Sequence, residues 1–359
     1  MKNVWYLAIA LLPIVFISGC VGSNGVFSAF NFISGEKEEI VAPNDVLLID
    51  KVNVIPDPPI YADTPFTVNF QVMNVGKVSE GDKEARNVKA TLYDWGLCHP
   101  TDKNGNELKL DYTSQVIGLE NKTIYPGGAE LVEFYLKAPT NEELSRMENR
   151  CPLRFKVEYE FDAYTTSDLI VVSRERIVEA SRSGETIHVT PLKTQSRGPL
   201  KIDIDFDTTQ PVSSEIIVPT IIKVEDKGSG MYEKIPPGSL ILKFPAGIEV
   251  LKEGTSFCQP SGWFESVDEA LDRIRDTLPE SKLKEFMSKI HSPYEGTVLI
   301  NTKEIPLIKG ETPVIRCSLR VTDEVKNIKT FTIMGEIKNY VYPLYHEEYV
   351  TVKPTYVEE

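Results

Sequence analysis

The stretch FTVNFQVMNVG, residues 66–76, alternates apolar and polar side chains with a period of two. Its apolar positions are Phe66, Val68, Phe70 and Val72, and polar residues stand between them. Because successive side chains of a strand point to opposite faces, this pattern predicts a strand with one buried side. The same theme recurs in VLLIDKVNVIP, NVKATLYDWG, AELVEFYLKAP and CPLRFKVEYEFDA. Short strands separated by turn residues predict a mainly β fold, a sandwich or barrel and not a parallel α/β sheet.

Three motifs in this region resemble the CARDB type of immunoglobulin-like domain. They are VMNVG at residues 72–76, NVKATLY at 87–93, and YPGG at 125–128 with the Phe-Tyr-Leu strand after it. The resemblance covers about residues 45–173 and implies an immunoglobulin-like sandwich without catalytic or ligand residues shared across the family. The cysteines and the long stretch 98–111 depart from the family pattern. In these two features the region is similar to surface-exposed archaeal variants of the domain.

We therefore expect tandem immunoglobulin-like antiparallel β-sandwiches. Residues 45–192 form the CARDB-like sandwich, 193–199 (KTQSRGP) the linker, and 200–359 the second sandwich. In the second half, IIKVEDKGSG and GSLILKF take the places of FQVMNVGK and NVKATLY, which suggests a diverged repeat. A short helix is predicted after Ser173, with Ile177 and Val178 facing inward and Gly184 near its end.

A helical pattern interrupts the second sandwich at residues 266–291. Val267, Leu271, Ile274 and Leu278 recur at helical spacing, and Ser266 with Glu269 fits a capping box. We expect an inserted α-helical hairpin. It is either a docking or lid element, or a cover for one open end of the sandwich.

The N-terminus has the order of a secretory signal: Lys2, an apolar run to Ile17, and then Ser18-Gly19-Cys20. The run is shorter than the roughly 18 to 20 apolar residues that span a bilayer comfortably. The cysteine after Ile-Ser-Gly resembles the lipobox of a lipoprotein signal. We expect residues 1–19 to be the signal peptide, Cys20 to carry the lipid, and residues 20–44 to form a tether; a simple signal or a retained anchor is the alternative. The expected location is the outer face of the cell membrane.

The remaining cysteines, Cys98, Cys151, Cys258 and Cys317, form an even set, which suits an oxidising compartment. Of the three possible pairings, Cys98 with Cys151 and Cys258 with Cys317 keeps each disulfide inside one expected domain. A structural disulfide beside a surface histidine is the favoured interpretation of Cys98-His99, ahead of a metal or catalytic site. Asn121 opens an Asn-Lys-Thr sequon and is a candidate glycosylation site.

The formal net charge of −14 argues against nucleic acid as a partner. The histidines fall at no zinc-ligand spacing, and Ser229 lacks the sequence context of a hydrolase nucleophile. Asp203, Asp205 and Asp207 alternate along one strand and are candidate Ca²⁺ ligands, although a solvated strand face explains them too. We predict no cofactor.

The late tyrosines Tyr340, Tyr342, Tyr345 and Tyr349 fit either half-buried strand positions or a strip that binds sugar or protein. Together these features predict a non-catalytic surface lipoprotein that presents its domains for binding or envelope assembly. Its partners are the membrane, through the lipid, and other envelope proteins or glycans. The alternative is a secreted enzyme acting on surface glycans. It requires a carboxylate pair about 5 to 10 Å apart between the domains.

Overall fold

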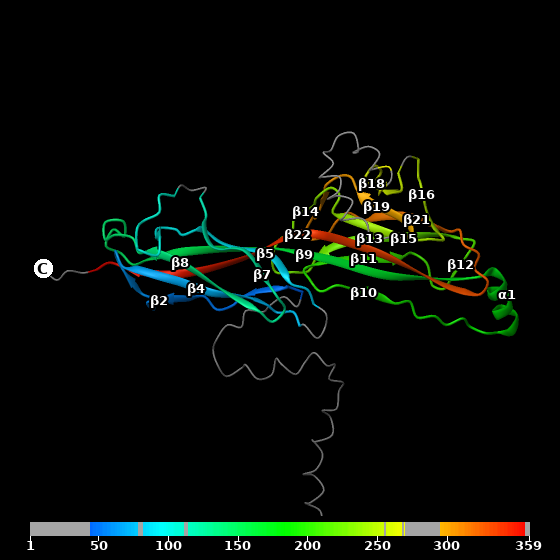
Figure 1. Ribbon diagram of the computed structural model, residues 1–359, viewed down its shortest axis with the longest axis horizontal. Helices are drawn as coiled ribbons and strands as arrows, with labels where there is room; N and C mark the ends of the chain where they lie inside the picture. The colour runs from blue at the N-terminus through cyan, green and yellow to red at the C-terminus, as the bar shows by residue number, and fades with distance from the viewer. Residues whose placement is uncertain are drawn as a thin grey trace, which may run out of the picture. The chain divides into compact units, whose positions relative to one another are not determined.

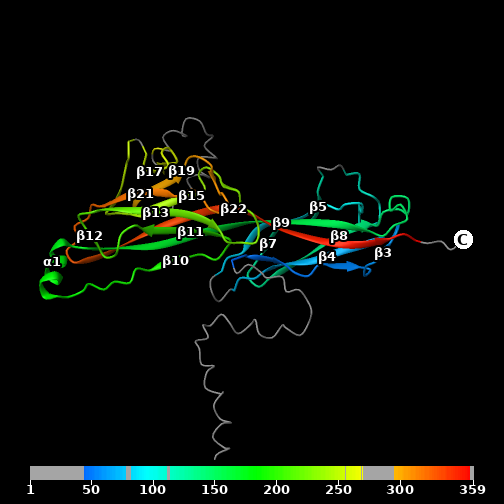
Figure 2. The same cartoon turned by 180° about the vertical axis from the view of Figure 1, so that it is seen from behind.

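A computed structural model describes residues 44–77, 82–110, 114–254, 256–267, 269 and 295–355. Figures 1 and 2 show its ribbon from opposite sides. The described residues are mainly β, in sheets that are almost entirely antiparallel, with one described helix, α1 (Arg174–Ser183). The β class predicted from the alternating pattern is confirmed.

The described strands lie in three large sheets and one small one. One five-stranded sheet contains β1 (Leu47–Ile49), β2 (Asn53–Ile55), β4 (Pro65–Asn74), β6 (His99–Thr101) and β8 (Ala129–Lys137). The ten-stranded sheet contains β3 (Ile60–Tyr61), β5 (Ala85–Asp94), β7 (Val116–Ile124), β9 (Asn149–Val172), β10 (Lys193–Gln195), β12 (Val212–Ser213), β15 (Leu240–Pro245), β18 (Phe264–Ser266), β19 (Gly296–Asn301) and β22 (Ile328–Lys353). The second five-stranded sheet contains β11 (Leu200–Phe206), β13 (Ile217–Asp226), β16 (Ile248–Leu251), β17 (Cys258–Gln259) and β21 (Ile315–Val321). The small sheet pairs β14 (Lys234–Ile235) with β20 (Ile305–Pro306).

The first sandwich packs the sheet of β4 and β8 on one half of the ten-stranded sheet. The ring centroids of Phe70 on β4 and Phe134 on β8 lie 5.1 and 5.4 Å from that of Phe155 on β9. All three side chains are buried, as are the four apolar positions that alternate along β4. The predicted inward face of this strand is confirmed.

The second sandwich packs the sheet of β11 and β13 on the other half of the ten-stranded sheet. Ile202 and Ile204 of β11 are buried, whereas Phe206 is half-buried at the margin of the core. A Cβ on Gly335 of β22 would lie 3.0 Å from a side-chain carbon of Ile202. This close approach brings the two sheets together at a position where a larger side chain would force them apart.

Strands β9 and β22 form one continuous ladder that serves both sandwiches (Figures 1 and 2). Their pairing runs from Ile328 with Val172 to Val352 with Asn149, with an irregularity between Ile337 and Tyr340. Strand β22 is therefore one strand, although the sequence pattern suggests two separate pieces, KTFTIMGEIKNYVYPLY and EEYVTVKP.

The ladder differs from the expected division into residues 45–192 and 200–359. Residues 340–352 of β22, expected in the second sandwich, pair with residues 149–161 of β9 in the first. The expected linker 193–199 contains β10, which pairs with residues 165–167 of β9. Pairing between segments so far apart in the chain leaves no local signal in the sequence.

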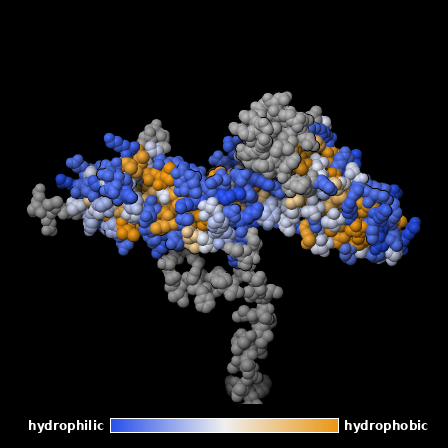
Figure 3. Space-filling model, viewed as in Figure 1, coloured by the Kyte–Doolittle hydropathy of each residue, from blue (hydrophilic) through white to orange (hydrophobic). Residues whose placement is uncertain are grey.

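Helix α1 has the ends that the sequence predicts. The Ser173 side chain accepts a hydrogen bond from the Arg176 N–H, and Gly184 ends the helix in the left-handed conformation. The expected inward orientation of Ile177 and Val178 is wrong: they are 37% and 38% exposed. Ala180 is the buried position of this helix, and Figure 3 shows apolar side chains at the surface beside α1.

Two predicted segments fall largely outside the described residues. They are residues 1–43, which hold the expected signal peptide, Cys20 and most of the tether, and the expected helical insertion beyond Glu269. At the start of the insertion, the Glu269 N–H donates to Ser266 Oγ at 3.3 Å, as a capping box requires. Across the described ranges, no helix combines the length and apolar character needed to cross a membrane.

Asn74 shows what two of the short motifs do in the fold. Its Nδ2 donates to the carbonyl oxygens of Ile124 and Lys83, at 2.9 and 3.3 Å, and its Oδ1 accepts from the Gly76 N–H at 2.9 Å. Its backbone bonds to the YPGG turn through the Gly127 N–H and the Gly128 carbonyl. One buried amide thus joins the end of β4 to the turn before β8 and to the loop before β5.

We expect Asn74→Ala to lower the free energy of unfolding by about 2 to 4 kcal/mol, because buried backbone groups lose their partner. Urea unfolding followed by circular dichroism measures this change. Asn53→Ala is the matched control: Asn53 is exposed and donates one hydrogen bond to the Lys51 carbonyl, so its loss should cost less than about 0.5 kcal/mol. Equal losses for the two variants would show that the Asn74 network does not stabilise the fold.

Candidate functional site

Both disulfides join the cysteines that were expected to pair within one domain. Cys98 and Cys151 have Cα atoms 5.9 Å apart and join the edge of the β6 sheet to β9. Cys258 and Cys317, with Cα atoms 4.5 Å apart, are register partners on β17 and β21. Sequence separations of 53 and 59 residues correspond to about 4 kcal/mol each in the chain-entropy model.

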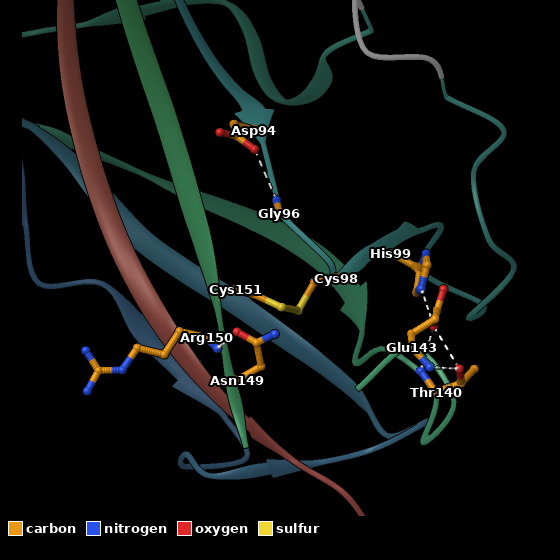
Figure 4. Close-up of a disulfide and its surroundings, with 9 residues drawn as sticks. All are labelled: Asp94, Gly96, Cys98, His99, Thr140, Glu143, Asn149, Arg150 and Cys151. Atoms are coloured by element: carbon orange, nitrogen blue, oxygen red, sulfur yellow. Dashed lines mark hydrogen bonds and ion pairs between the residues drawn. A yellow bond between two sulfur atoms is a disulfide. The ribbon is translucent and has the colours of Figure 1, made fainter. Parts of the chain in front are cut away.

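His99 stands beside the first disulfide but belongs to a different contact (Figure 4). Its Nε2 lies 3.1 Å from Glu143 Oε2, which also accepts from the Thr140 N–H at 2.7 Å. The hydrogen bond from the Thr140 N–H, with the His99 contact, lowers the pKa of Glu143. Figure 4 shows the histidine ring turned toward Glu143 and away from the sulfur atoms, so the pair is a surface contact.

A lysine side chain lies between two of the three aspartates that are candidate Ca²⁺ ligands. Lys193 Nζ contacts the carboxylates of Asp203 and Asp205, the second at 2.8 Å. Burial raises the pKa of Asp203, whereas the lysine hydrogen bond lowers that of Asp205. Asp207 follows the end of β11 and is exposed. In the described ranges, no group of three or more His, Cys, Asp or Glu residues is placed to hold a metal.

Asn121 is exposed on β7, in a left-handed backbone conformation with φ of 54°. Asparagine adopts this conformation more readily than most residues. The sequon therefore lies at the surface, and glycosylation of Asn121 stays a prediction.

The four late tyrosines do not share one environment. Tyr340 and Tyr342 are buried, whereas Tyr345 and Tyr349 are 56% and 51% exposed. Side chains alternate along a strand, so in this part of β22 the even-numbered residues face the core and the odd-numbered ones face outward. The two exposed tyrosines therefore lie on the outer face of the first sandwich.

Three further side chains, one aromatic and two charged, join them to form what we call the tyrosine face: Tyr93, Arg154, Tyr345, Glu347 and Tyr349. The rings of Tyr93 on β5 and Tyr345 meet edge to face, with centroids 6.4 Å apart and planes at 86°. Arg154 of β9 donates through Nε to Glu347 at 2.8 Å.

The charges of the tyrosine face are balanced and held in place. Arg154 Nη1 also donates to Asp94 at 2.8 Å, so two carboxylates fix the guanidinium. This hydrogen bonding lowers the pKa of Glu347. Burial raises the pKa of Tyr93, and the Glu347 carboxylate raises that of Tyr349, so both phenols are neutral at neutral pH. The sequence does not single out Tyr93 or Arg154, because only the register of three strands brings them beside Tyr345.

A second cluster lies where the first sandwich begins. Asp45 accepts the Ser229 N–H at 3.1 and 3.2 Å through its two oxygens, and Asn44 donates to the Lys227 carbonyl. Ser229, which lacks the sequence context of a hydrolase nucleophile, is thus part of a turn that the Asp45 carboxylate holds in place. Gly230 is required there, because a Cβ would lie 1.9 Å from the Pro343 carbonyl oxygen.

Asp226 organises the other side of this turn. It accepts hydrogen bonds from the Gly228 N–H, the Tyr232 N–H and the Tyr342 hydroxyl, at 3.1, 2.9 and 2.8 Å. Burial raises the pKa of Asp45, and the nearby Asp226 adds to this effect against the lowering effect of Ser229. These two carboxylates contact one turn from two sandwiches, and both accept hydrogen bonds from its backbone.

Comparisons with known proteins give little more. No family model and no curated protein matches the chain. Among solved structures, Escherichia coli α-2-macroglobulin activated by porcine elastase is similar at a TM-score of 0.21 and 9% identity, over 86% of this chain and 33% of that chain. A DUF4466 family protein from Parabacteroides merdae is similar at a TM-score of 0.18 and 11% identity, over 82% of this chain and 100% of that chain. The chain thus spans about a third of the α-2-macroglobulin chain, and these scores are too low to indicate a shared fold or function.

Asp45→Asn tests the burial of this carboxyl. Because burial raises its folded-state pKa above the ordinary value of 3.8, the folded state holds the proton more tightly than the unfolded state. The stability that the neutral form provides is therefore lost as pH rises through the folded-state pKa. We expect the variant to gain stability relative to the natural protein between about pH 3 and about pH 7, measured by urea unfolding at each pH.

Asp205→Asn is the control of opposite sign. The Lys193 hydrogen bond lowers the pKa of Asp205, so this group stabilises the fold above its unfolded-state pKa and loses that effect as pH falls. This variant should lose stability relative to the natural protein as pH rises. The same pH trend in both variants would contradict the assignment for Asp45.

Proposed function

We propose that this chain is a non-catalytic lipoprotein anchored at the outer face of the cell membrane. It uses the tyrosine face to bind another protein of the cell envelope. The observation that carries the proposal is the exposure of Tyr345 and Tyr349 beside an arginine that two carboxylates hold in place. Tyrosine and arginine are enriched at protein interfaces and among the residues that supply most of the binding energy.

The rigidity of the tyrosine face supports this role. Tyr93 packs against Tyr345, and Arg154 bonds to both Glu347 and Asp94, so little side-chain freedom remains to be lost on binding. Since the guanidinium of Arg154 is bonded to two carboxylates, a protein surface can cover it without leaving an unpaired cation.

The remaining parts of the proposal come from the sequence. The Ile-Ser-Gly-Cys motif supports lipidation of Cys20, and the four paired cysteines suit an oxidising compartment. The CARDB resemblance supports a tandem immunoglobulin-like arrangement and a role in assembly. Nucleic acid is not expected as a partner, given the net charge of −14.

Little favours the enzyme alternative. Asp45 and Asp226 are the carboxylates that approach each other from the two sandwiches, and their hydrogen bonds go to the turn at residues 228–232. An acid and base pair for glycoside hydrolysis needs carboxyl groups directed at substrate. The backbone contacts of both groups support a structural role.

A photoreactive phenylalanine analogue at Tyr345 or Tyr349 should cross-link a reproducible envelope protein on intact cells. Mass spectrometry of the joined chains identifies that protein. The same analogue at Tyr125 is the matched control, because Tyr125 is 67% exposed but lies on the turn before β8, outside the tyrosine face. If position 125 cross-links the same protein in equal yield, or if positions 345 and 349 cross-link none, the tyrosine face is not a protein interface.

Cys20→Ser tests the anchor. If Cys20 carries the lipid, the natural chain should fractionate with membranes and carry a lipid mass at its new N-terminus. The variant should lack that mass and keep its signal segment. If the variant has the same N-terminal mass and processing as the natural chain, Cys20 carries no lipid. The N-terminus is then a simple signal peptide or a retained anchor.

A further inference from the structure

A polar groove lies along β9 where two neighbouring strands leave a gap. Pairing of β9 with β5 ends at Glu160, and pairing with β10 begins at Thr165. Between them, residues 161–163 have no strand beside them on that edge, and the backbone of Tyr164 bonds to Ser196, just after β10. Side chains from three separate segments turn this gap into a concave site of about 240 Å³.

The groove is of a size for one small ring. Its lining includes Lys83 from the loop before β5, Phe161 and Tyr164 from β9, and Gln195 from the end of β10. Pockets for drug-sized ligands usually have about 300 to 1,000 Å³, so this groove suits a ligand of monosaccharide size. Tyr164 is 42% exposed, and the Lys83 ammonium lies over its ring.

Two of the charged groups in the groove are already paired. Asp82 accepts from Arg197 at 3.0 Å, and Asp162 accepts from Arg86 at 2.9 Å. Lys83 differs: among the described residues no carboxylate lies within ion-pair distance of its Nζ, which stands 5.6 Å from the centroid of the Tyr164 ring. The groove therefore presents one cation available to an anionic ligand, on a chain with a net charge of −14.

The groove also contains hydrogen-bond acceptors, on Asp162 and Gln195. Asp162 uses Oδ1 for Arg86 and for the Asn339 N–H, and Gln195 uses Nε2 for the Ile202 carbonyl. Asp162 Oδ2 and Gln195 Oε1 accept no hydrogen bond from the described part of the chain. Two such acceptors suit the hydroxyl groups of a sugar.

We propose that this groove binds an acidic monosaccharide unit, such as a uronic acid of an envelope glycan. Lys83 bonds to the sugar carboxylate, the Tyr164 ring packs on the ring of the sugar, and Asp162 and Gln195 accept from its hydroxyl groups. The proposal needs neither the tyrosine face nor a protein partner, so it stands or falls separately from the proposed function.

Saturation-transfer NMR on the full chain, with methyl glucuronide and methyl glucoside as ligands, tests the proposal. From its number of non-hydrogen atoms, the glucuronide should bind with a dissociation constant of about 1 mM, and at least about tenfold more tightly than the glucoside. Lys83→Gln should abolish this preference. Tyr164→Ala should weaken both ligands by about tenfold.

Four controls make the result decisive. Lys103→Gln removes an exposed lysine from a loop outside the groove and should change neither ligand. Thermal unfolding of each variant establishes that it is folded, and Tyr164→Phe keeps the ring and should keep the binding. Acetate tests the carboxylate alone and should bind far more weakly than the glucuronide.

Four outcomes would overturn the proposal. They are equal binding of the two sugars, no binding of either, acetate binding as tight as that of the glucuronide, or an unchanged preference in Lys83→Gln. None of these outcomes would alter cross-linking from Tyr345, so failure here is distinguishable from failure of the protein interface.

Discussion

The backbone ladder between β9 and β22 is the interaction on which the rest of the structure depends. Each half of this strand pair forms the floor of one sandwich, so both five-stranded sheets pack on the same ten-stranded sheet. The buried apolar residues accordingly form one main cluster that extends from β4 and β8 through β9 to β11 and β13. Separating the two strands would break the backbone hydrogen bonds of this ladder in both sandwiches.

The alternation of side chains along the same two strands assigns the functional candidates to their positions. Inward residues such as Phe155 and Tyr342 build the cores, and outward residues such as Arg154 and Tyr345 build the tyrosine face. The groove at Tyr164 arises differently, from the unpaired stretch of β9 between β5 and β10. Strand β9 thus contributes Arg154 to the tyrosine face and Phe161, Asp162 and Tyr164 to the polar groove, which suit different kinds of ligand.

Local patterns predicted the features that depend on neighbouring residues. The inward face of β4 and the ends of α1 at Ser173 and Gly184 follow from sequence spacing. The favoured disulfide pairing follows from keeping each bridge inside one expected domain. The continuity of β22 and its return to the first sandwich depend on pairing between distant segments, which periodicity does not report. The exposure of Ile177 and Val178 was missed for a related reason. Only the packing of the whole fold decides which face of a short helix is covered.

Asn74 connects the sequence motifs to the proposed sugar site. Asn74 belongs to the VMNVG motif at the end of β4, and its side-chain amide bonds to the carbonyl oxygen of Lys83. That contact fixes the backbone of the residue whose ammonium group lies near Tyr164. A backbone held in this way has less freedom to lose when a ligand binds to its side chain. The same asparagine therefore links the end of β4 to the backbone of a residue that lines the groove.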